Sequence, residues 1–175
     1  MFINLTDVLT SEDKVITMQV DTDMTQVSIN EETFQIAEKS PVRFTFTNIG
    51  KNKALIEGEA EFIFAMNCDR CLKPVESKMM LSFSRNIYSK DGEEILSEEE
   101  DDMGFMEGYQ LKVNDLLNNE IMINWPMKVL CKPDCKGICP KCGKDLNTGD
   151  CECDTFVPDP RMAVIKDIFN ANKEV

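Results

Sequence analysis

Hydrophobic and polar residues alternate along the first half of the chain. Residues 14–21 and 42–48 are short, rich in β-branched and aromatic side chains, and bounded by turn residues, which is typical of strands. In 54–66 the alternation is clearest. One face carries Ile56, Ala60, Phe62, Phe64 and Met66, and the other carries Glu57, Glu59 and Glu61. This pattern predicts a half-buried strand with one face in the core.

The segments around 54–66 predict two antiparallel hairpins. Residues 50–53 (GKNK) are a turn signal that would join 42–48 to 54–66. A further alternation follows, with apolar positions at Val75, Met79, Leu81, Phe83 and Ile87. It predicts the next neighbouring strand, so that CDRCLKP, residues 68–74, lies at the tip between two strands.

Residues 90–108 carry nine acidic side chains and one basic one. Their self-repulsion and low apolar content predict an exposed loop. We interpret this loop as a solubilising insertion. The alternative is a segment that docks a basic partner.

A helix is expected over residues 114–124, packed on the sheet. Asn114 or Asp115 would cap its start, and Pro126 would follow its end. The apolar residues at approximately helical spacing are Leu111, Val113, Leu116, Leu117, Ile121 and Ile123.

A second, amphipathic helix is expected near the C-terminus. Asp159 would be its N-cap and Pro160 its first residue, where a missing N–H has no cost. Its apolar stripe consists of Met162, Ile165, Ile168 and Phe169. We expect this stripe to pack on the domain, and the alternative is a helix that binds a partner.

These elements predict an α+β fold in two parts. Residues 1–126 would form an antiparallel β-rich domain with one packed helix. Residues 127–175 would form a small, cysteine-rich, zinc-ribbon-like lobe and the terminal helix. A chain of 175 residues is long enough for one ordinary domain and such a lobe.

The net charge of the chain is -13. Nucleic acid is therefore not attracted by the protein as a whole. No apolar run is long enough to cross a bilayer, and the start MFINLTDVLTSEDK lacks the basic-then-apolar order of a secretory signal. We expect a cytoplasmic protein, whose cysteines would not usually form disulfides.

Six of the eight cysteines lie in one run near the C-terminus, and the chain contains no histidine. A zinc site would therefore be all-cysteine, possibly with a carboxylate, and no imidazole can activate a catalytic thiolate. Residues 139–143 (CPKCG) have the form of a zinc knuckle, in which Gly143 relieves the backbone. The first predicted zinc site is Cys139, Cys142, Cys151 and Cys153. Cys131 and Cys135 could replace one of its pairs.

Cys68 and Cys71 could join Cys131 and Cys135 in a second zinc site that attaches the lobe to the hairpin tip. The pair could instead stay reduced and metal-free. It could also be a thiol-disulfide couple, although such motifs usually open a helix after a strand. A metal-handling role is a further alternative. Zinc in the lobe would contribute on the order of 10 kcal/mol of folding free energy, so we expect one or two structural ions.

Five segments carry a family pattern: CDRCLKP after an alternating strand, the acidic loop, the helix followed by a proline, LCKPDCKGICPKCGKDLNTGDCEC, and DPRMAVIKDIF. Together they resemble the YceD family, the large ribosomal RNA subunit accumulation proteins, over nearly the whole chain. The Cys68 and Cys71 pair is the element that this family shares most widely. The C-terminal cluster is typical of its Gram-positive-type members.

This resemblance implies a cytoplasmic bacterial protein that supports accumulation of 23S ribosomal RNA. Its partner would be the large-subunit precursor or a basic ribosomal protein. No catalytic residue is established for the family, so we expect no enzyme. Direct RNA binding stays open, because the basic residues of the lobe are nearly matched by acidic ones and would have to share one face. Those basic residues are Lys128, Lys132, Lys136, Lys141 and Lys144.

Overall fold

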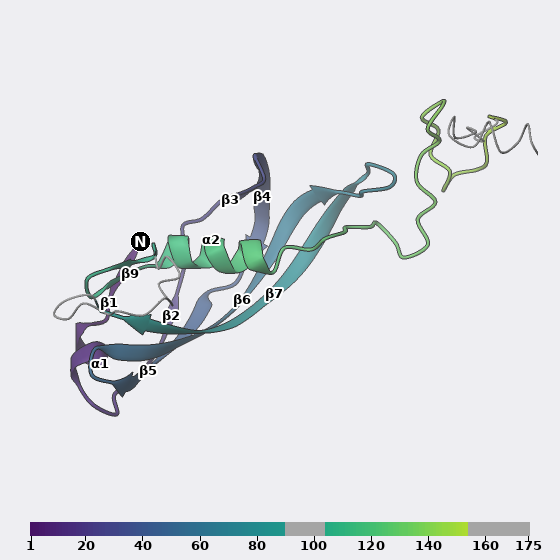
Figure 1. The fold of residues 1–175 in the computed structure, drawn as a ribbon. Helices are drawn as coiled ribbons and strands as arrows, with labels where there is room; N and C mark the ends of the chain where they lie inside the picture. The colour runs from purple at the N-terminus through teal and green to yellow at the C-terminus, as the bar shows by residue number, and fades with distance from the viewer. Residues whose placement is uncertain (90–103, 154–175) are drawn as a thin grey trace, which may run out of the picture.

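The computed structural model describes residues 1–89 and 104–153, and a long antiparallel hairpin lies at its centre (Figure 1). Strands β6 (Lys53–Asn67) and β7 (Pro74–Tyr88) form this hairpin. They pair along their whole length, from Lys53 opposite Tyr88 to Asn67 opposite Pro74. The residues between the strands, 68–73, form the tip of the hairpin.

Four further strands complete the larger sheet. They are β2 (Val15–Val20), β3 (Gln26–Ile29), β4 (Glu32–Lys39) and β5 (Val42–Gly50). The strand order is β2-β5-β6-β4-β3, with β7 on the other edge of β6. The first part of β6 pairs with β5 and its later part with β4, and all pairs are antiparallel. The hairpin therefore continues beyond its neighbours to carry the tip.

Aromatic side chains fill the buried face of this sheet. Phe44 and Phe46 of β5 are fully buried, as are Phe62 and Phe64 of β6. Full burial of one such side chain contributes about 1.5–3 kcal/mol. The glutamates that alternate with them on β6 are exposed or half-buried. The predictions of strands over 14–21, 42–48, 54–66 and around 75–87 are thus confirmed.

A smaller sheet and a short helix lie at the end of the fold opposite the tip (Figure 1). β1 (Phe2–Asn4) pairs with β9 (Gln110–Lys112), which pairs with β8 (Met106–Glu107). Helix α1 (Thr6–Thr10) follows β1 and buries Val8 and Leu9. The sequence patterns predicted none of these elements, because three strands of two or three residues are too short to show a period.

Helix α2 (Val113–Ile123) matches the helix expected over 114–124. Its predicted cap is wrong, because Lys112 precedes the first helical residue and no side chain caps the helix. β9 runs directly into α2, which places Asn114 inside the first turn. There the Asn114 side chain donates to Asp23 and accepts from Thr22, at 2.8 Å and 3.2 Å.

Two contacts hold α2 and its exit on the larger sheet. Arg85 of β7 donates to both carboxylate oxygens of Glu120, whose side chain is 3% exposed. Beyond the helix, the Trp125 ring packs against Phe64 and Phe34, with ring centroids 5.0 Å and 4.7 Å apart. These contacts direct the chain toward the hairpin tip. Within residues 1–89 and 104–153, no helix has the length and apolar character needed to span a bilayer.

The predicted acidic loop is only partly within reach of the structure. Residues 90–103 lie outside the described residues. The predicted end of the loop at residue 108 is wrong, because Phe105 is buried in the core and Met106–Glu107 is a strand. Phe105 and Met106 pack against the core, and the burial of these apolar side chains is more favourable than leaving this segment as an exposed acidic loop.

The C-terminal part of the fold is irregular where it is described. In 127–153 the backbone pairing is a single bridge between Ile138 and Asp145. A mostly antiparallel, β-rich α+β fold is therefore confirmed, whereas the zinc-ribbon form and the division into 1–126 and 127–175 stay predictions. The terminal helix expected after Asp159 lies outside the described residues.

Candidate metal centres

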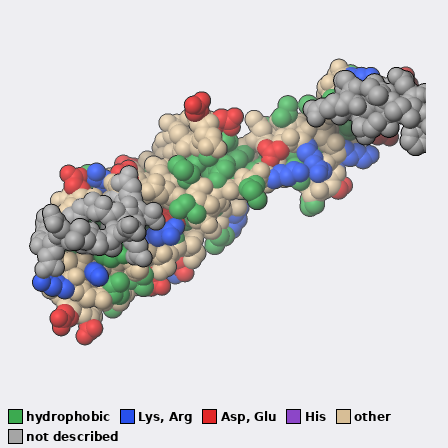
Figure 2. Space-filling view, in the orientation of Figure 1, with side chains coloured by type: hydrophobic (Ala, Val, Ile, Leu, Met, Phe, Trp, Pro, Cys, Tyr) green, Lys and Arg blue, Asp and Glu red, His purple; other side chains and the backbone are tan. Residues whose placement is uncertain are grey.

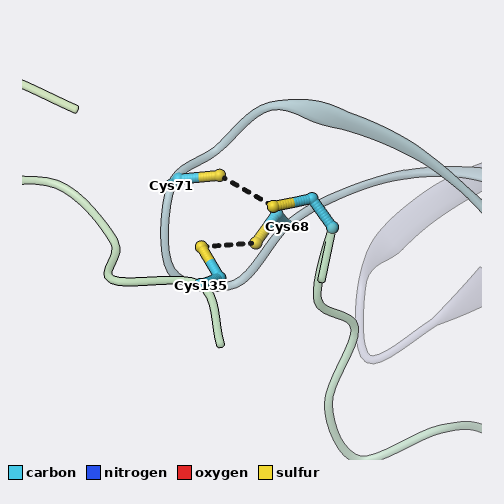
Figure 3. A group of neighbouring side chains, drawn as sticks. Cys68, Cys71 and Cys135 are labelled. Atoms are coloured by element: carbon cyan, nitrogen blue, oxygen red, sulfur yellow. Dashed lines mark hydrogen bonds between the residues drawn. The ribbon is translucent and has the colours of Figure 1, made fainter. Parts of the chain in front are cut away.

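The tip of the β6–β7 hairpin is a tight turn built around Cys68. The Cys68 N–H donates to the Lys73 carbonyl at 2.8 Å, and the Leu72 N–H donates to the Cys68 carbonyl at 2.9 Å. Leu72 has a φ of +60°, a left-handed conformation that is uncommon outside glycine and asparagine. The turn holds Cys68 and Cys71 three residues apart with their side chains on one side (Figure 3).

The turn that begins at Cys139 has the same hydrogen-bond pattern. The Cys139 N–H donates to the Lys144 carbonyl at 2.9 Å, and the Gly143 N–H donates to the Cys139 carbonyl at 2.9 Å. Gly143 takes the position of Leu72, with a φ of +72°. The two C-x-x-C segments are therefore the same local structure, one on a hairpin and one in the lobe.

The structure brings Cys68 and Cys71 together with Cys131 and Cys135, and we name these four the tip tetrad. Their sulfur atoms all lie within 4.8 Å of one another. The sulfurs of Cys68 and Cys135 are 3.8 Å apart (Figure 3). The sulfurs of Cys71 and Cys131 are 3.5 Å apart. A tetrahedral ion with metal–sulfur bonds of about 2.3 Å separates its sulfurs by about 3.8 Å. The tetrad thus has the dimensions of such a site.

A second group consists of Cys139, Cys142, Cys151 and Cys153, named here the lobe tetrad. Its sulfurs also lie within 4.8 Å of one another. The structure therefore groups the cysteines into the predicted first quartet and into the second quartet, which was one of the alternatives for the remaining four. All eight are free, without a disulfide. The alternative in which Cys131 and Cys135 replace a pair of the lobe tetrad does not match this grouping.

Solvent access differs within each tetrad. Cys68 and Cys135 are fully buried, and Cys71 is 6% exposed, whereas Cys131 is exposed. Val75, Leu130 and Ile138 pack around the buried thiols. In the lobe tetrad Cys139 is buried and the other three cysteines are exposed or half-buried. Each tetrad thus has a protected side and one side that faces water.

The thiols of the tip tetrad have divergent pKa values. Although burial opposes its ionisation, backbone N–H donors at Cys131, Cys71 and Arg70 lower the pKa of the Cys68 thiol to about 6. The hydrogen bond with Cys71, together with burial, raises the pKa of the Cys131 thiol to about 12. Four adjacent thiols cannot all lose their protons without a cation to offset the charge. A divalent metal would supply that charge and release those protons.

The lobe tetrad has the same division. Backbone N–H groups of Cys142 and Lys141 lower the pKa of the Cys139 thiol to about 6. The neighbouring Cys142 thiol, together with burial, raises the pKa of the Cys153 thiol to about 12. Both knuckle turns therefore aim backbone N–H groups at their first sulfur, which prepares that sulfur to be a thiolate ligand.

A polar cluster beside the tip tetrad was not predicted from the sequence. The Asn147 side-chain amide donates to the Cys135 sulfur at 3.4 Å and to Asp145 Oδ1 at 2.7 Å. The second oxygen of Asp145 pairs with Lys73 Nζ of the hairpin tip at 2.6 Å. These contacts with Lys73 and Asn147 lower the pKa of the Asp145 carboxyl to about 2. The sequence signal for this cluster is the turn at residues 145–148 (DLNT), because Asp and Asn side chains favour such local hydrogen bonds.

Backbone contacts join the lobe to the hairpin next to the tetrad. Val129 N–H donates to the Asp69 carboxylate at 2.6 Å, and Asp69 N–H donates back to the Val129 carbonyl at 2.9 Å. Arg70 donates from its guanidinium to the Cys135 carbonyl at 2.6 Å. A Cβ on Gly137 would lie 3.0 Å from the Arg70 carbonyl oxygen, so this close approach favours glycine.

Lys and Arg side chains lie together on the visible face of the lobe (Figure 2). The exposed basic residues in and next to the lobe are Arg70, Lys73, Lys128, Lys132, Lys136, Lys141 and Lys144. Lys132 and Lys136 are within 3.7 Å of Asp134 and Asp150, respectively. The local charge is therefore mixed, in contrast to the strongly acidic chain as a whole.

Comparisons with known proteins place the chain in a family. Uncharacterized proteins of Mycobacterium bovis and of two Mycobacterium tuberculosis strains are each 28% identical to it over 79 residues. The match spans 45% of this chain and only 38% of each relative. No solved structure matches the chain. The family model described as large ribosomal RNA subunit accumulation protein YceD matches residues 56–169, from the β6–β7 hairpin through both tetrads, and the chain belongs to the YceD family.

Proposed function

We propose that this protein is a non-catalytic accessory factor of ribosome biogenesis. It supports accumulation of 23S ribosomal RNA during assembly of the large subunit, in the cytoplasm. Membership of the YceD family supports this role, since the family is described by accumulation of the large-subunit RNA. The observation that supports a non-catalytic role is the pair of four-cysteine groups.

Both tetrads are proposed to hold structural zinc. Four soft thiolates complete a tetrahedral shell and leave no position for water or substrate, as in structural zinc sites. The chain contains no histidine, which is a common ligand in catalytic zinc sites. Zinc in the tip tetrad would cross-link residues that lie 60 and 67 positions apart in the sequence. The ion would thereby fix the lobe at the end of the hairpin.

The charge of the chain suggests which kind of partner the protein binds. A chain with a net charge of -13 attracts a basic partner more readily than a phosphate backbone. The proposed partner is therefore a basic ribosomal protein or the large-subunit precursor that contains it. The basic residues gathered on the lobe (Figure 2) would limit any direct RNA contact to that end of the molecule.

Metal content tests the structural part of the proposal. The purified protein should contain two zinc ions per chain. Cys68→Ser and Cys142→Ser should each lower that number by one, because each removes a ligand from a different tetrad. Iron in place of zinc would indicate iron–sulfur clusters and overturn the zinc assignment. Rapid alkylation of Cys68 in the metal-loaded protein would instead favour the thiol-disulfide alternative.

Ribosomal RNA levels test the cellular role. A strain that lacks the gene should contain less 23S relative to 16S ribosomal RNA, and the wild-type gene should restore the ratio. Complementation by Cys68→Ser and by Lys51→Ala makes a matched comparison. Lys51 is exposed in the turn between β5 and β6, so its substitution leaves both tetrads and the basic residues of the lobe intact. An unchanged RNA ratio in the deletion strain would overturn the proposed function.

A further inference from the structure

The segment between the two halves of the lobe tetrad contacts the tip tetrad. Residues 143–150 are bounded by Cys142 and Cys151, which both belong to the lobe tetrad. Inside this segment the Asn147 amide donates to the Cys135 sulfur, and Asp145 pairs with Lys73 of the hairpin tip. The loop that one metal site would close therefore supplies polar groups to the other site.

Backbone hydrogen bonds hold this loop in register with the tip tetrad. Lys136 N–H, next to Cys135, donates to the Asn147 side-chain oxygen at 3.0 Å. Leu146 N–H donates to the Gly137 carbonyl at 2.9 Å, and Asp145 bridges Ile138. Only Gly137, Ile138 and Lys136 separate the tip ligand Cys135 from the lobe ligand Cys139. The two tetrads thus share a short, hydrogen-bonded connection.

We propose that Asn147 and Asp145 are positioning residues that couple metal binding at the two tetrads, so that filling either site raises the affinity of the other. This inference rests on the proposed zinc sites. A metal ion in the lobe tetrad restrains both ends of 143–150, which removes conformational entropy that the loop would otherwise lose in contacting the tip.

The chemical role of each group follows from its contacts. The Asn147 N–H stabilises negative charge on the Cys135 sulfur, as outer-shell donors do for metal ligands. Asp145 accepts from the same amide and from the Asn147 backbone N–H at 2.9 Å, which orients the amide. Lys73 holds Asp145 from the hairpin side. All three contacts are needed to fix the direction of the Asn147 amide, and together they involve both the hairpin tip and the lobe.

Cobalt titration of the full chain tests this coupling, because thiolate-bound Co²⁺ gives charge-transfer bands that report each site. In Cys142→Ser/Cys153→Ser the tip tetrad keeps its four ligands, and its Co²⁺ affinity should fall about 5–150-fold, the usual range for coupling between two binding sites. In Cys68→Ser/Cys135→Ser the lobe tetrad should lose affinity by the same factor, because coupling is reciprocal. Chelator competition measures both values.

Asn147→Ala separates positioning from ligand loss, since all eight thiols remain. It should reduce cooperativity and shift the charge-transfer band of the tip tetrad, whereas Lys51→Ala, in the exposed turn between β5 and β6, should change neither. A purely structural role for Asn147 would lower stability without moving that band. Two wild-type sites that fill independently, with equal affinities in the tetrad variants, would overturn the coupling and leave the zinc sites in place. A wild-type chain that binds no Co²⁺ or Zn²⁺ would overturn both.

Discussion

Replacing Gly58 with alanine tests how closely the hairpin core is packed. Gly58 lies on β6 opposite Phe44 of β5 and Phe83 of β7. A Cβ at this position would lie 2.2 Å from Cζ of the Phe83 ring and 2.6 Å from its Cε1. Non-bonded carbon atoms are in favourable contact at about 3.5–4.0 Å. The ring would therefore have to move by more than about 1 Å to admit one methyl group.

The surroundings of Phe83 restrict that movement. Its ring is 8% exposed and packs edge-on against Phe44, with centroids 6.3 Å apart. Overpacking of this kind costs about 1–3 kcal/mol. Replacing glycine with alanine also reduces the conformational entropy of the unfolded chain, which offsets about 0.4–1 kcal/mol of this loss. The expected net loss for Gly58→Ala is about 1–2 kcal/mol, which corresponds to a fall in Tm of about 2–8 °C for a domain of this size.

Urea unfolding at saturating zinc measures this loss. Trp125 is the single tryptophan and packs against Phe64 of the same core, so its fluorescence reports the sheet. Gly104→Ala is the matched control, because a Cβ there would meet nothing within 4 Å. Phe83→Leu should relieve part of the loss in a double variant. If Gly58→Ala unfolds at the same urea concentration as Gly104→Ala, the packing argument is wrong.

Three further predictions concern the cysteine-rich region. The Asp145 carboxyl should titrate near pH 2 by carbon-13 NMR, and Lys73→Met should return its pKa toward 3.8. Because the pKa of Asp145 is lowered in the folded protein, the ion pair stabilises the fold above pH 3.8. That stabilisation is lost as the pH falls toward 2. Leu72→Gly should raise stability by up to about 1 kcal/mol and Gly143→Leu should lower it by about 1–2 kcal/mol, since both positions are left-handed; equal effects of the two changes on chemical unfolding would contradict this. Removal of zinc by a chelator should open all eight thiols to a chromogenic disulfide reagent while Trp125 fluorescence stays native-like, and loss of both signals together would show that the sheet also depends on the metal.

Local patterns were sufficient for β2, β5, β6, β7 and α2, but they missed β4, although it is eight residues long. The cysteine spacing offered the two quartets only as one of several groupings. The alternation from Ile56 to Met66 spans enough residues to define a period, and β6 follows it. The knuckle form of 139–143 depends on near neighbours, and its hydrogen bonds match that expectation. By contrast, β3, β8 and β9 are two to four residues long, so their pairing partners and not their own patterns define them.

The sequence by itself determined that any metal ligands would be cysteine thiolates, that the cysteines come as closely spaced pairs, and that one pair lies on a turn between strands. It could not determine that Cys68 would meet Cys135, because that contact depends on where α2 and Trp125 direct the chain. Nor could it place Asn147 against a sulfur, since that contact exists only once the lobe lies beside the hairpin. Spacing along the chain sets local geometry, whereas contacts across some 60 residues are decided by how the core packs.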